Sequence, residues 1–63
     1  TGGDAPGALE DALIVVDRSP RDGKAWVLLG HARRMTGDTP GATRAWCRAA
    51  ELGEAAAKAL CGE

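Results

Sequence analysis

Several residue types are scarce or absent in this chain of 63 residues. It has no phenylalanine or tyrosine, one methionine, one histidine, two tryptophans and two cysteines. Two cysteines are too few for the disulfide framework that supports many small secreted domains. His31, Cys47 and Cys61 are also the only soft metal ligands, and no Cys-x-x-Cys or His-x-x-x-His pair is present. Because a structural zinc ion takes four ligands, we expect no metal site.

A strong charge and a long apolar run are missing as well. The formal net charge is −1, whereas nucleic-acid-binding domains usually carry a basic excess. The longest aliphatic run, Leu13–Val16, is far shorter than the ~20 residues that cross a bilayer. We therefore expect neither nucleic-acid binding nor a membrane span. The compartment stays undetermined, with a soluble cytoplasmic chain favoured over a periplasmic one.

The short length limits what the chain can do. A chain of this size buries only about 60% of the surface that its unfolded form exposes, so its core is marginal and a deep enzyme pocket is not expected. It is one small domain or a piece of a larger protein. Abundant glycine, alanine, arginine and proline with few isoleucines and lysines are typical of a GC-rich genome, most simply a bacterial one.

A catalytic triad is not supported by the polar residues present. Ser19, Asp22 and His31 could be drawn as nucleophile, orienting acid and base. However, Ser19 precedes a proline in a turn, Asp22 is the predicted cap of a helix, and no Gly-x-Ser-x-Gly elbow occurs. The glycine pairs lack the Gly-Lys-Ser/Thr ending of a phosphate-binding loop. We expect no enzyme and no cofactor.

An internal repeat with a period of 34 residues organises the chain. When the sequence is shifted by 34 positions, residues 3–8 fall on residues 37–42 with five identities in six positions. Lys24-Ala25 falls on Lys58-Ala59 in the same register. A repeat of this length indicates a supersecondary unit that stacks on its neighbours.

Four helices and no strands are predicted, so the fold class is all-α. Ser19-Pro20 ends a first helix, because the residue before a proline avoids the helical region. Asp22 is the predicted cap of a second helix, and Asp38 or Thr39 that of a third. Gly53 is placed to close the third helix in a left-handed conformation. The apolar residues that recur at helical spacing in the second helix are Ala25, Trp26, Leu28, Leu29 and Ala32.

The chain resembles the tetratricopeptide repeat (TPR) family. That family has a 34-residue helix-turn-helix unit with Trp-x-x-Leu-Gly-x-x-Tyr, then Ala-x-x-x-Phe, then Pro. Residues 26–30 read Trp-Val-Leu-Leu-Gly, Ala42-x-x-x-Trp46 follows, and Pro20 stands where the preceding unit ends. Arg33 stands where the family has the large aromatic residue Tyr. Glu54 stands where the complete unit would end in proline.

This resemblance implies an antiparallel helix-turn-helix segment of an α-solenoid. Residues 1–63 then form one TPR-like domain, with the second helix of one unit at 5–18, a complete unit at about 23–53 and the start of the next at 54–62. Both tryptophans are expected in the seam between the two helices of one unit. The implied repeat core is Ala8, Trp26, Leu29, Gly30, Ala42, Trp46 and Ala49.

The first helices of successive TPR units line a concave groove. The groove-facing residues that the resemblance implies are Lys24, Val27, His31, Arg34, Met35 and Lys58, with Cys61 beside them. Three of these side chains are basic, which suits an acidic peptide or a C-terminal carboxylate. We therefore expect a protein-interaction scaffold that presents this groove to a peptide or a partner helix.

The first helix supports a second hypothesis. It is apolar nearly all round, and the helix that would precede it in its unit is missing, so one flank is expected to be bare. A large bare apolar patch usually marks an interface. The residues expected there are Leu9, Leu13 and Val16. Through them the chain would form a homodimer or stack on the rest of its parent chain. The alternative function is thus a self-associating structural or assembly segment of a larger bacterial protein, such as an envelope-assembly helper similar to the TPR components of cytochrome c maturation.

The two cysteines are expected to stay apart. Ala42, Trp46 and Ala49 define the buried face of the third helix, and Cys47 lies about 100° further round, toward solvent. In the family's arrangement Cys61 faces the groove. The sequence alone leaves their redox state open, but diverging side chains cannot be bridged, so no disulfide is predicted.

Overall fold

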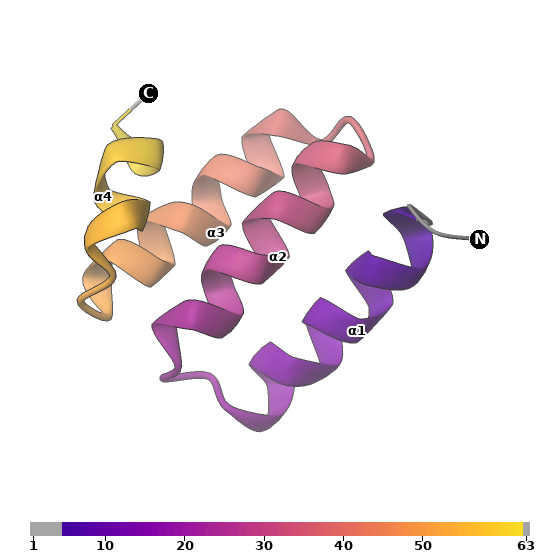
Figure 1. The fold of residues 1–63 in the computed structure, drawn as a ribbon, viewed down its shortest axis with the longest axis horizontal. Helices are drawn as coiled ribbons and strands as arrows, with labels where there is room; N and C mark the ends of the chain where they lie inside the picture. Colours follow the sequence, from indigo (N-terminus) through magenta and orange to yellow (C-terminus); the bar gives the residue numbers. More distant parts are fainter. Residues whose placement is uncertain (1–4, 63) are drawn as a thin grey trace.

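The computed structural model describes residues 5–62 and consists of helices throughout. The helices are α1 (Ala5–Arg18), α2 (Gly23–Met35), α3 (Thr39–Glu51) and α4 (Ala55–Cys61). Helices α1, α2 and α3 lie side by side in alternating directions, and the short α4 packs on α3 (Figure 1). No strand occurs in the described residues. The predicted all-α architecture of helical hairpins is confirmed, while Gly3 and Asp4, the first residues of the internal repeat, lie outside the described range.

Two aspartates begin the central helices, as predicted. A carboxylate oxygen of Asp22 accepts a hydrogen bond from the backbone N–H of Lys24 at 3.1 Å. Asp38 accepts one from the N–H of Gly41 at 3.0 Å, so Asp38 rather than Thr39 is the cap of α3. These bonds satisfy donors that have no partner within the helix.

Two glycines in left-handed conformations end the same helices. Gly37 has φ of 89° and Gly53 has φ of 98°, so the prediction for Gly53 is confirmed. The next residue in each case returns a hydrogen bond: Asp38 N–H to the Arg33 carbonyl at 2.9 Å, and Glu54 N–H to the Ala49 carbonyl at 3.1 Å. This is the Schellman arrangement, which fixes where α2 and α3 stop and how the chain turns back.

Small residues fill the core and let the helices approach closely. Leu29 is the largest fully buried side chain, and alanines from three helices surround it. The first cluster joins α1, α2 and α3 through Ala12, Val16, Ala25, Leu29, Ala32 and Ala45. The second joins α3 and α4 through Ala42, Trp46, Ala49 and Ala57. The chain therefore has two adjoining clusters, one on each side of the α2–α3 hairpin.

The described part of the chain contains no helix with the length and hydropathy needed to cross a membrane.

Candidate partner-binding surface

Trp46 forms the seam between α2 and α3. Its side chain is 4% exposed, and its indole N–H donates to the backbone carbonyl of Val27 at 3.3 Å. A Cβ atom at Gly30 would overlap the indole ring, so this position of α2 must be glycine for the ring to approach the helix this closely. The structure thus places Gly30 and Trp46 together in the seam between α2 and α3.

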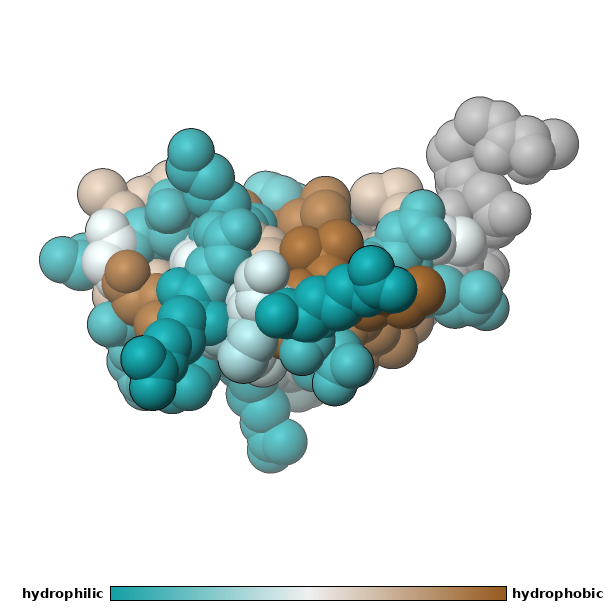
Figure 2. All heavy atoms as spheres, turned by 90° about the horizontal axis from the view of Figure 1, so that it is seen from below, coloured by the Kyte–Doolittle hydropathy of each residue, from teal (hydrophilic) through white to brown (hydrophobic). Residues whose placement is uncertain are grey.

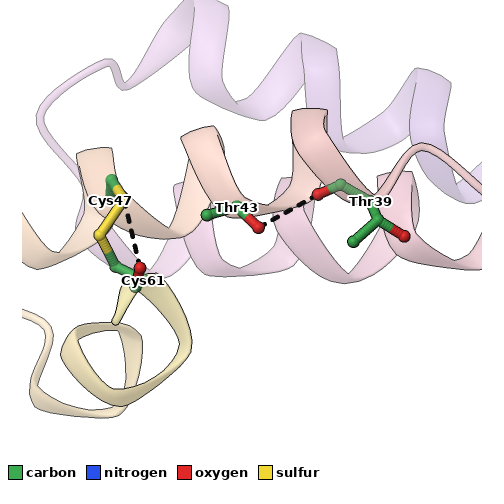
Figure 3. The surroundings of a disulfide bond; sticks show 4 residues. All are labelled: Thr39, Thr43, Cys47 and Cys61. Carbon is green, nitrogen blue, oxygen red and sulfur yellow. Dashed lines mark hydrogen bonds between the residues drawn. A yellow bond between two sulfur atoms is a disulfide. The ribbon is translucent and has the colours of Figure 1, made fainter. Parts of the chain in front are cut away.

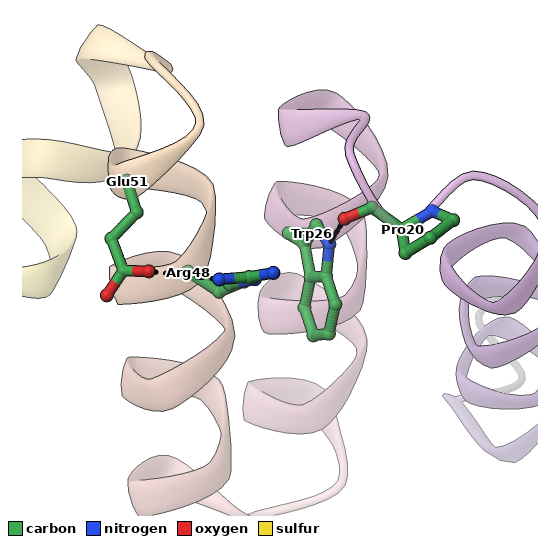
Figure 4. Close-up of polar contacts among 4 residues, drawn as sticks. All are labelled: Pro20, Trp26, Arg48 and Glu51. Atoms are coloured by element: carbon green, nitrogen blue, oxygen red, sulfur yellow. Dashed lines mark hydrogen bonds and ion pairs between the residues drawn. The ribbon is translucent and has the colours of Figure 1, made fainter.

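Trp26 lies at the edge of the hairpin and is only half-buried. Its indole N–H donates to the carbonyl of Pro20 at 2.8 Å, which ties the loop before α2 to the helix (Figure 4). The guanidinium carbon of Arg48 lies 6.0 Å from the ring centroid, and Arg48 also pairs with Glu51 at 3.1 Å. The ring packs against both core clusters. Its placement therefore differs from that of Trp46, although a shared seam was expected for both.

The predicted groove residues of α2 lie along one helix face. Lys24, His31, Arg34 and Met35 are exposed, and Val27 is half-buried. The imidazole of His31 lies edge-on to the ring of Trp46, with 5.6 Å between the ring centroids. The exposed imidazole of His31 therefore lies over the buried indole of Trp46.

Helix α4 borders the same region. Val27 packs against the second cluster, which includes Ala57 of α4. The half-buried Leu60 of α4 packs against the same cluster. Lys58 follows Ala57 directly and is exposed. Val27 of α2 and the helix that carries the third basic residue therefore share one apolar cluster.

Leu28 adds an apolar side chain to the exposed part of α2. It is one of the apolar residues at helical spacing in α2, and its side chain is 47% exposed. Met35, seven residues later and on the same face, is 56% exposed. The helical angle could have shown this, because Ala25, Leu29 and Ala32 already form a complete buried stripe.

The surface that results combines positive charge with apolar area. Lys24 and Arg34 lie about three turns apart on α2, with Leu28, His31 and Met35 between or beside them. No cavity is found in residues 5–62, so a ligand at this surface would lie on an open face. Such a face suits an extended peptide or a helix better than a small molecule.

An apolar face of α1 is exposed as well. Leu13 and Val15 are exposed, and Ile14 is 53% exposed. Viewed from the side of α1, Figure 2 shows hydrophobic side chains gathered there and crossed by hydrophilic ones. Val16 is only 8% exposed and Leu9 is half-buried against the first cluster, so these two do not form the bare flank expected of them. The burial of Ala12 and Val16 against α2 turns residues 13–15 outward.

Cys47 and Cys61 form a disulfide bond, contrary to expectation (Figure 3). Their Cα atoms are 4.7 Å apart, which is within the range that a disulfide spans. The prediction was wrong because α4 packs on the side of α3 that carries Cys47, which makes that residue half-buried rather than solvent-facing. Cys61 consequently points to α3 and not into the groove.

Arg33 fills a position where TPR units carry a large aromatic residue. It is half-buried, and its guanidinium donates to the carbonyl of Gly41 at 3.4 Å. The side chain thus reaches from the end of α2 to the start of α3. Arginine is accommodated here because its side chain extends to α3, where its guanidinium finds a backbone carbonyl as acceptor.

Comparison with known proteins gives a similar sequence, from a protein with TPR repeats. Over 44 residues, the chain is 43% identical to a TPR repeat-containing protein, PA0015, of Pseudomonas aeruginosa. The match covers 70% of this chain and 42% of that protein, so the chain spans less than half of the relative's length. No family model and no solved structure matches the chain. The chain is therefore a helical protein similar in sequence to a bacterial TPR repeat-containing protein.

Proposed function

We propose that the chain is a TPR segment that binds a protein or peptide partner and has no catalytic role. The sequence similarity, the 34-residue repeat and the fit of Gly30 against Trp46 support the assignment to the family. The exposed face of α2 carries the functional part of the proposal. Lys24 and Arg34 provide positive charge there, and Leu28 and Met35 provide apolar contact area.

The partner proposed for this face is an acidic peptide with at least one apolar side chain. Carboxylates would pair with the two basic residues of α2 and with Lys58 on α4. An apolar side chain would contact Leu28 and Met35, which leave apolar surface in water when the face is free. Exposed ion pairs contribute little each, so the apolar contact is needed for affinity and the charges for orientation.

A charge-reversal experiment tests this proposal. Fluorescence anisotropy would measure binding of labelled eight-residue peptides that contain aspartate, glutamate and one leucine. We expect Lys24→Glu combined with Arg34→Glu to weaken binding at least tenfold, because attraction to the peptide becomes repulsion. Binding to the unchanged chain should fall as salt rises, since exposed charges are screened.

A matched control carries the same charge change elsewhere. Arg21 in the first loop and Arg44 on α3 are both exposed and lie outside the α2 face. Arg21→Glu combined with Arg44→Glu should leave the affinity within about twofold, because long-range effects are screened beyond about 10 Å. Equal loss in both double variants, or no binding of acidic peptides to the unchanged chain, would contradict the proposed surface.

The exposed apolar face of α1 favours a second function. Residues 13–15 present three large aliphatic side chains to solvent on one helix. Contiguous apolar patches of this kind commonly mark interfaces. The alternative proposal is a structural segment that associates through α1 with a second copy or with another helix of a larger bacterial protein.

A further inference from the structure

Helix α4 is short and buries only one of its residues against the rest of the chain. It has seven residues, of which Ala57 alone is buried, whereas α2 buries Gly23, Ala25, Leu29, Gly30 and Ala32. Its cap residue, Glu54, makes no side-chain capping hydrogen bond. Isolated helices this short are unstable in water, so α4 depends on its attachment to α3.

The disulfide joins the far end of α4 to the middle of α3. Cys61 is the last residue of the helix, and Cys47 precedes it by 14 positions. The Schellman turn at Gly53 already fixes the near end of α4. Both ends of α4 are thus attached to α3. The disulfide holds the C-terminal end, which has no turn joining it to α3 and would otherwise separate first.

The internal repeat shows what the disulfide replaces. Shifted by 34 positions, Cys47 falls on Leu13 of α1 and Cys61 falls on Val27 of α2. The first hairpin therefore has two aliphatic residues where the second has the bonded cysteines. A disulfide at these positions can be made and broken, whereas aliphatic side chains offer no such chemistry.

We propose that the Cys47–Cys61 bond is a redox-controlled clamp on α4. In the oxidised chain α4 is docked on α3. A dithiol reductant opens the bond by attack of its thiolate on one sulfur, followed by displacement through its second thiol. The reductant ends as a disulfide, and both cysteines take up protons and become thiols. In the reduced chain α4 separates from α3 much more often.

The clamp also regulates the α2 surface, and this step rests on the proposed function. Detachment of α4 removes the positive charge of Lys58 from the neighbourhood of the α2 face and takes Ala57 out of the cluster against which Val27 packs. Acidic peptides are then expected to bind the reduced chain more weakly than the oxidised chain.

Amide hydrogen exchange of the full chain tests the clamp directly. The unmodified protein would be compared before and after reduction with dithiothreitol, with free thiols counted in each sample. Closing a loop of about 15 residues favours the closed state by about two orders of magnitude. We expect protection of the α4 amides to fall about 100-fold on reduction, while protection in the α2–α3 hairpin changes less than threefold.

The control is Cys47→Ala combined with Cys61→Ala, which should be insensitive to dithiothreitol and exchange like the reduced chain. Undiminished α4 protection after complete reduction would overturn the clamp, as would two free thiols in protein purified without reductant. Peptide binding in the same samples separates the two proposals. Loss of α4 protection without peptide binding in either state supports the clamp and contradicts the binding surface.

Discussion

At the residue scale, Gly30 and Trp46 show how one position constrains another. Alanine is usually about 1 kcal/mol better than glycine inside a helix. At position 30, however, a Cβ atom would overlap the indole of Trp46, whose N–H is fixed on the Val27 carbonyl. The contact between helices therefore outweighs helix propensity at this position.

Gly30→Ala should consequently destabilise the chain. Overpacking of a core position typically costs about 1–3 kcal/mol, which exceeds the gain in helix propensity. Urea denaturation followed by tryptophan emission would measure the free energy of unfolding. Gly62→Ala is the control, because Gly62 has φ of −74° and a Cβ there meets only ordinary contacts. A Gly30→Ala chain as stable as this control would contradict the packing described.

At the scale of the element, each central helix is delimited by its own caps. The Asp22 and Asp38 side chains accept from early N–H groups, and the glycines at 37 and 53 reverse the chain. These interactions join residues within a few positions of one another. They are present because of local sequence, and they set the length of α2 and α3 before any packing.

Removal of the α3 cap gives a measurable prediction. Asp38→Ala removes the acceptor for the Gly41 N–H and should lower the free energy of unfolding by about 1 kcal/mol. Asp38→Asn keeps a side-chain oxygen in place and should change stability much less. Thermal unfolding monitored by circular dichroism would compare the two variants. An equal loss in both would show that the negative charge, and not the hydrogen bond, is responsible.

At the scale of the whole molecule, the chain exposes two apolar areas on different sides of a small core. Leu28 and Met35 on α2 lie among basic residues, whereas residues 13–15 on α1 form an aliphatic run. The two areas support different functions. The first fits binding of an acidic peptide, and the second fits association with another apolar helix.

Sedimentation equilibrium distinguishes these functions. If α1 mediates association, the average mass should rise with concentration, and Ile14→Glu should return the chain to a monomer, because a buried unpaired carboxylate is costly. Leu28→Glu is the matched control, since it makes the same kind of change at a similarly exposed leucine. A chain that is monomeric across a hundredfold concentration range would argue against association through α1.

The sequence by itself determined the helices, their caps and the left-handed Gly53. These features follow from residues close together in the chain or from a repeat with a fixed period. Tertiary structure alone decided the burial of Val16 and the Cys47–Cys61 bond. Helical periodicity gives the angles between side chains on one helix, but not the rotation of that helix against its neighbours. The packing of α4 on α3 fixed how the two helices are rotated against each other, and this brought Cys47 and Cys61 together. The groove residues remain a prediction until a partner is tested.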